Sequence, residues 1–162
     1  VVFGPGDRFL NTFARLASLF PVLPLACPNA RFQPVYVEDV VACIIDSLSH
    51  PESAGQAYDL CGPTVYTLRQ LVERVGELTG NRRPIIGLSR GLSMVQAAML
   101  ELAPGDLMSR DNVASMQVDS VCDGCALPFD RVPTPLEAVA GGYLGERSPK
   151  ARYSPLRAKA KR

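Results

Sequence analysis

The 162-residue chain has no tryptophan, a single histidine and no lysine before Lys150. It also has no run of about 18 consecutive apolar residues, the length that a membrane-spanning helix requires. A structural zinc site needs four ligands, and the one Cys-x-x-Cys pair, Cys122 and Cys125, has only the sequence-distant His50 to draw on. We therefore predict no metal site, and we interpret this cysteine pair as incidental loop residues.

Charged residues are scarce at 20%, and their distribution is uneven although the net charge is only +1. Seven of the 17 basic residues lie in 147–162, which contains no acidic residue. The residues before this segment therefore include 10 basic and 16 acidic side chains. We predict that 147–162 is a basic, disordered tail, either a solvated end or a segment that attracts an anionic membrane surface. The rest of the chain has no basic surface interleaved with aromatic residues, which argues against nucleic acid as a partner.

The five cysteines are an odd number and, apart from the last pair, are scattered. Cys43 falls on an expected helix and Cys61 at the end of an expected strand, where a free cysteine commonly serves as a small buried apolar residue. This pattern favours a reducing, cytoplasmic setting over a framework of disulfides.

Helical and strand patterns alternate along the chain, which predicts an α/β fold. Expected helices cover residues 8–20, with Asp7 as cap, 67–79 and 92–103. A further expected helix begins at Glu38 and has an apolar stripe of Val40, Val41, Ile44, Ile45 and Leu48. A last, short helix is expected after Thr134, its cap. Expected strands cover 1–3, 31–37, 56–61 and 85–88. Because Val1 opens within an apparent strand, we expect the sequence to be a fragment of a longer protein.

The helix over 67–79 has the strongest local signals. Thr67 and Gln70 have the spacing of a capping box, in which each side chain satisfies a free backbone amide at the start of a helix. Gly80 supplies the residue type that most often ends a helix in a left-handed conformation.

Three segments in order resemble extended short-chain dehydrogenases/reductases, the NAD-dependent epimerase/dehydratase family. They are VFGPGD from Val2, RFQPVYVEDVV from Arg31, and YDLCGP from Tyr58 followed by Tyr66-Thr67-Leu68. The resemblance covers roughly residues 1–90. Within it, residues 33–40, together with Ser109-Arg110-Asp111-Asn112, are most similar to an atypical branch, which contains the nucleotide-binding accessory subunit of respiratory complex I.

This resemblance implies the C-terminal part of a Rossmann-like doubly wound fold, with 1–146 forming the substrate-side portion and the small substrate-binding lobe. It implies that Phe3, Gly4 and Pro5 approach the nicotinamide end of NAD or NADP. It further implies that Arg31, Gln33 and Tyr36 line a site for a small-molecule substrate.

Structural alternatives for these residues stay open. The Gly4 turn is either a tight connection or a ligand wall. Arg31 either binds a substrate phosphate or pairs with Glu38 or Asp39. Tyr36 is either a ligand contact or a core aromatic, and we favour Asp39 as a helix cap over a catalyst.

The family's Tyr-x-x-x-Lys pair supplies the acid for hydride transfer, and no tyrosine here has a lysine four residues later. We therefore predict no catalytic residue and no tight cofactor binding in this chain alone. The first hypothesis is the substrate-side half of an NAD(P)-dependent oxidoreductase, epimerase or dehydratase. The alternative is a non-catalytic NAD(P)H-binding scaffold or assembly protein, cytoplasmic or peripheral to the inner membrane. An exposed sheet edge also predicts a homo-oligomer.

Overall fold

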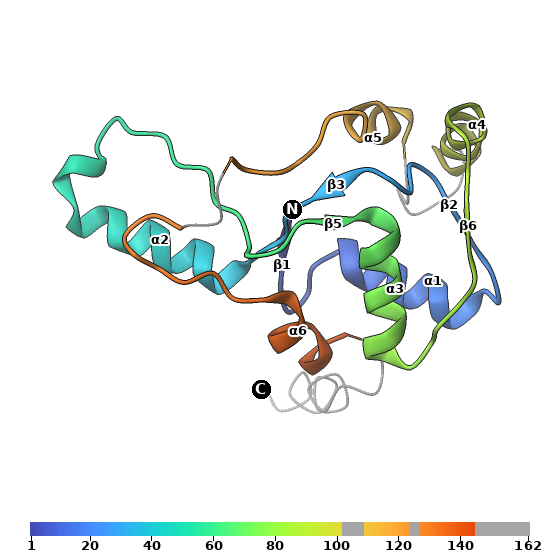
Figure 1. Ribbon diagram of the computed structural model, residues 1–162, viewed down its shortest axis with the longest axis horizontal. Coiled ribbons are helices and arrows are strands. Elements are labelled where there is room, and N and C mark those ends of the chain that lie inside the picture. Colours follow the sequence, from blue (N-terminus) through green and yellow to red (C-terminus); the bar gives the residue numbers. More distant parts are fainter. Residues whose placement is uncertain (102–108, 124–126, 145–162) are drawn as a thin grey trace, which may run out of the picture. The chain divides into compact units, whose positions relative to one another are not determined.

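The computed structural model describes residues 1–101, 109–123 and 127–144 (Figure 1). The predicted basic tail over 147–162 and Cys125 lie outside these ranges. Helices and short strands alternate, which confirms the predicted α/β class. The chain divides into two compact units, each built from segments that are not contiguous in sequence.

The first unit comprises Val1–Asp7, Gln33–Val65 and the described residues from Val121 onward. Its two strands, β1 (Val2–Phe3) and β4 (Val35–Tyr36), pair in parallel. Its helical elements are α2 (Val37–Ser49), the 3-10 turn η1 (Pro51–Ser53), α6 (Leu136–Val139) and the 3-10 turn η2 (Ala140–Gly142).

Helix α2 shows how far the apolar pattern predicts burial. Cys43 is buried against Val35 and Leu127, which confirms its expected role as a free, buried apolar residue. The predicted apolar stripe is otherwise largely exposed, with Ile44 at 57% and Leu48 at 84% of their reference areas. The pattern thus identified the helix, but it could not say what covers the helix. The predicted homo-oligomer stays a prediction.

The second unit comprises Arg8–Phe32 and Tyr66–Ser120, of which 102–108 are not described. Its helices are α1 (Phe9–Leu19), α3 (Leu68–Thr79), α4 (Arg90–Glu101) and α5 (Arg110–Ser115). Strand β2 (Leu23–Leu25) pairs in parallel with β6 (Ile85–Gly87), and β3 (Arg31–Phe32) pairs antiparallel with β5 (Tyr66–Thr67).

Helix α3 confirms its sequence signals. Thr67 Oγ1 accepts a hydrogen bond from the Gln70 amide, and Gln70 Oε1 accepts one from the Thr67 amide. Gly80 ends the helix at φ 72°, a left-handed conformation that costs glycine little. The helix packs on α1 through a face on which Leu71 and Val75 are fully buried.

Three local expectations were wrong. Residue Arg8, not Asp7, stands at the N-cap of α1, because Asp7 is held within the preceding turn. Residues 56–61 form no strand, since they lack a partner strand to complete a hydrogen-bonded ladder. Pro135 is the N-cap of α6, and Thr134 bonds instead to Asp39.

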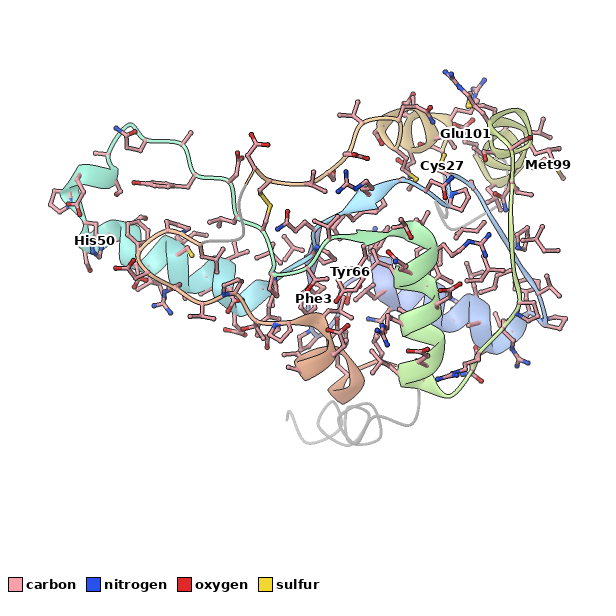
Figure 2. All side chains as sticks on the ribbon, viewed as in Figure 1. Phe3, Cys27, His50, Tyr66, Met99 and Glu101 are labelled. Carbon is pink, nitrogen blue, oxygen red and sulfur yellow. A yellow bond between two sulfur atoms is a disulfide. The ribbon has the colours of Figure 1, made fainter. Side chains whose placement is uncertain are left out.

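The expectations of a free Cys61 and of Cys122 as an incidental loop residue were also wrong. Cys61 forms a disulfide with Cys122, which is 61 residues away in sequence (yellow bond in Figure 2). Sequence spacing gave no sign of this pair, because the two cysteines meet only when 60–62 and 121–123 come together within the first unit.

Candidate functional site

The candidate site lies at the carboxyl edge of the β1–β4 pair. The parallel register sets Phe3 opposite Tyr36, the last residue of each strand. Their rings pack with centroids 5.5 Å apart, and Phe3 is almost fully buried. Ligands of open α/β sheets bind outside the carboxyl ends of the strands. The predicted cofactor-contacting residues Phe3, Gly4 and Pro5 and the predicted substrate-contacting Tyr36 therefore lie at one such edge.

The turn from Gly4 to Asp7 requires glycine at two positions for two reasons. A Cβ at Gly4 would lie 2.5 Å from Val37 Cγ1, so the start of α2 leaves no room for a side chain. Gly6 has φ 90°, a conformation that other residues rarely adopt, and a Cβ there would meet nothing within 4 Å. The Asp7 amide closes the turn by donating to the Gly4 carbonyl oxygen at 3.0 Å. This turn is tight, as one alternative proposed, and its ligand contact stays a prediction.

Tyr143 joins this turn from far along the chain. It follows η2 and is only 9% exposed. Burial, followed by the adjacent Asp7 carboxylate, raises the pKa of the Tyr143 hydroxyl well above its usual value. The hydroxyl is therefore neutral over the whole physiological pH range. Sequence reasoning missed Tyr143, because no periodicity or spacing connects it with Asp7.

Gln33 has a different environment from the other predicted contacts. Its side chain is 2% exposed. Nε2 donates to the Gly62 carbonyl oxygen at 2.8 Å, and Oε1 accepts from the Cys122 amide at 2.9 Å. Both ends of the amide thus tie loops of the first unit together, and substrate contact by Gln33 stays a prediction.

Arg31 belongs to the second unit, on β3. Its guanidinium pairs with the Asp119 carboxylate at 3.3 Å, and both side chains are about half exposed. The partner is thus Asp119 rather than Glu38 or Asp39, the two partners that the sequence suggested. Half of the Arg31 side chain stays open to solvent, and its predicted phosphate contact is untested.

Asp39 lies in the first turn of α2, where the helix dipole favours an acidic residue. Its carboxylate is occupied by Thr134, whose amide and hydroxyl both donate to it. The N-cap of α2 is Tyr36, so the prediction that Asp39 caps this helix was wrong. The contact of Asp39 with Thr134 anchors the segment before α6 instead.

Two negative observations concern the described residues alone. Within these ranges, no group of three or more histidine, cysteine, aspartate or glutamate side chains is placed to hold a metal ion. None of the helices described here is both long enough and apolar enough to cross a membrane.

Comparison with known proteins identifies relatives among respiratory subunits. The chain is 30% identical over 155 residues to an Arabidopsis thaliana protein named NADH dehydrogenase [ubiquinone] 1 alpha subcomplex subunit 9, mitochondrial; the match covers 87% of this chain and 39% of that protein. It is 28% identical over 129 residues to the NADH-ubiquinone oxidoreductase 40 kDa subunit, mitochondrial, of Neurospora crassa, covering 79% of this chain and 34% of the relative. The chain thus spans less than half the length of these relatives. No family model matches it.

The solved structures agree on the fold. An NADPH-dependent quinone oxidoreductase from Escherichia coli, solved with NADPH, superposes with a TM-score of 0.56 at 20% identity. The superposition covers 81% of this chain and 49% of that one, and it shows a shared Rossmann-like fold. The sequence relatives, this fold and the three ordered motifs agree: the relatives are complex I 39/40 kDa subunits, which belong to the NAD-dependent epimerase/dehydratase family, and the chain has the Rossmann-like fold of that family.

Proposed function

We propose that this chain forms the substrate-side part of an NAD(P)H-binding protein and does not transfer hydride on its own. The parallel register of β1 and β4 is the observation that supports this proposal most. It brings Phe3, Gly4 and Pro5 to the same strand edge as Tyr36, where the family places the nicotinamide end of its cofactor.

The chain's own residues would form a wall of this site. Phe3 and Tyr36 offer aromatic surface, and Gly4 and Gly6 leave two positions of the turn without a side chain. The Tyr143 hydroxyl stays protonated against Asp7, so it would serve as a fixed neutral neighbour of the turn. The family's Tyr-x-x-x-Lys pair, which supplies the proton for carbonyl reduction, is absent from these 162 residues, and this supports the proposal that the chain does not transfer hydride on its own.

Between the two functional hypotheses, the sequence relatives favour the second. Both relatives carry names of subunits of a mitochondrial NADH dehydrogenase. On this basis, we propose that the protein acts as a non-catalytic nucleotide-binding accessory or assembly protein beside such a complex, at the inner membrane. The enzymatic alternative requires the catalytic pair in another part of the gene product.

Thermal unfolding with NADH or NADPH tests the proposal on this chain and on the product of the whole reading frame. We expect nucleotide to raise the melting temperature of the whole product and to leave that of the chain unchanged. A clear shift for the chain alone would place the cofactor site within these residues. The absence of a shift in both would refute nucleotide binding.

Two matched substitutions in the product of the whole reading frame test whether Tyr36 contributes to the nucleotide site. Tyr36→Phe removes one hydroxyl at the strand edge, and Tyr58→Phe removes one from a side chain whose ring packs on Phe129. We expect the first to weaken nucleotide binding several-fold and the second to have no effect. Equal affinities for the two variants would argue against a role for Tyr36.

A further inference from the structure

We propose that Cys61 and Cys122 form a reversible thiol–disulfide exchange site whose oxidation state controls the anchoring of β4. The two sulfurs are bonded, and their Cα atoms lie 6.3 Å apart, within the range of ordinary disulfides. This inference is independent of the proposed function, since it concerns the same chain whether or not nucleotide binds.

Gln33 connects the disulfide with β4. Its two hydrogen bonds end on Gly62, next to Cys61, and on Cys122 itself. The disulfide and the Gln33 amide therefore join the same two loops. Gln33 precedes Pro34 and β4 directly in sequence, so the loops that hold this side chain also fix the start of the strand that carries Tyr36.

Gly62 makes this junction tight. A Cβ at this position would overlap the Pro34 carbonyl oxygen, so the loop after Cys61 packs directly on the backbone that enters β4. A change in the position of this loop is therefore passed to Pro34 and Val35 by contact. Opening the disulfide removes the covalent restraint between the two loops, which the Gln33 hydrogen bonds also join.

Accessibility distinguishes this pair from Cys43. Cys61 and Cys122 are both of intermediate burial, so neither residue is closed off from solvent as Cys43 is. Cys43 is 4% exposed, and burial raises the pKa of its thiol, which makes it a poor nucleophile. Disulfides that form in a reducing compartment are usually transient and redox-sensing rather than structural.

Glutathione, a small thiol, can supply the two electrons that reduce the Cys61–Cys122 disulfide. A glutathione thiolate attacks one sulfur of the pair, forms a mixed disulfide and releases the other cysteine as a thiolate, which takes up a proton. A second glutathione thiolate attacks the mixed disulfide and releases the second cysteine. Two electrons pass to the protein, and one glutathione disulfide forms; oxidation is the reverse.

The test equilibrates the full chain in glutathione buffers from strongly reducing to strongly oxidising, followed by thiol trapping and peptide mapping. We expect the Cys61–Cys122 linked fraction to change with the buffer ratio. We also expect the Cys122 amide, which donates to Gln33, to exchange with deuterium at least tenfold faster in the reduced chain. A linked fraction that is constant across all buffers, or a Cys122–Cys125 link instead, would overturn the proposal.

Two cysteine variants distinguish a specific effect of the Cys61–Cys122 disulfide from a general loss of stability. Cys27→Ser removes a free thiol in the second unit and should leave both responses intact. Cys61→Ser should give the fast exchange of the reduced chain in every buffer. If its amide exchange instead equals that of the oxidised wild type, the disulfide does not anchor β4 and the inference fails.

Discussion

The carboxylate of Asp39 accepts two hydrogen bonds from Thr134, one from the backbone amide at 2.7 Å and one from the hydroxyl at 2.9 Å. These residues are 95 positions apart, and the contact fixes the segment before α6 to the first turn of α2. We expect Asp39→Ala to lower the free energy of unfolding by about 1–3 kcal/mol, because a partly buried amide loses its charged acceptor. Chemical denaturation measures the change.

The matched control is Glu38→Ala, since Glu38 is exposed on the same turn of α2. It should change the stability by less than about 0.5 kcal/mol. Equal effects of the two substitutions would mean that Asp39 acts through the helix dipole and not through Thr134.

The buried amide of Gln33 gives a second prediction. Gln33→Ala leaves the Gly62 carbonyl oxygen and the Cys122 amide without this partner, and we expect a loss of about 1–3 kcal/mol in the free energy of unfolding. Gln56→Ala, at an exposed position, is the control. Urea unfolding under oxidising conditions keeps the disulfide constant in all samples, and an unchanged midpoint for Gln33→Ala would refute the structural role.

Asp46 and Arg131 predict a pH dependence. The guanidinium of Arg131 bonds to both carboxylate oxygens of Asp46, one of them at 3.0 Å, and lowers the pKa of Asp46 below its ordinary value. Because the pKa of Asp46 is lowered in the folded state, the ionised carboxylate stabilises the fold, and this stabilisation is fully present above the unfolded-state pKa. It is lost as the pH falls through the folded-state pKa.

Asp46→Asn is the variant that isolates this effect. It should be less stable than the wild type at pH 7, and the difference should shrink as the pH falls below about 4, the ordinary range of an aspartate. Asp59→Asn, at an exposed position, should show no such convergence. Unfolding curves at several pH values check this, and a difference between wild type and Asp46→Asn that is independent of pH would contradict it.

The capping box of α3 gives the fourth prediction. Thr67→Ala removes the acceptor for the Gln70 amide and should cost about 1 kcal/mol of stability. Thr67→Ser keeps the acceptor and should retain most of the stability. Thr64→Ala, at an exposed position before the helix, is the control. Thermal unfolding checks the order of the variants, and equal stability of Ala and Ser at position 67 would contradict it.

Sequence reasoning succeeded where the deciding contacts are local. Thr67, Gln70 and Gly80 lie within one helix, and their residue types alone define its ends. The same holds for Gly6, whose left-handed conformation is a property of the turn itself, whereas the need for glycine at position 4 comes from the distant Val37. The family resemblance added the fold, because its three motifs keep their order along the chain.

It failed where the deciding contacts are distant in sequence. Cys61 finds Cys122, Thr134 finds Asp39, and Tyr143 lies beside Asp7, each across a separation that no periodicity encodes. The apolar stripe of α2 shows a related limit. Hydrophobic spacing records that a face favours burial, but it carries no information on the surface that buries it.

The interleaving of the two units has a consequence for synthesis. The first unit needs residues 1–7, 33–65 and the segment from 121, while the second takes its residues from the two intervening stretches. No single cut in the polypeptide can therefore release either unit whole. During translation, β4 follows β1 closely, but Asp39 and Cys61 must wait for their partners Thr134 and Cys122 until a further 95 and 61 residues have been made. Such long-range pairing slows folding, so nascent chains that stall between Cys61 and Cys122 should be the species on which chaperones act.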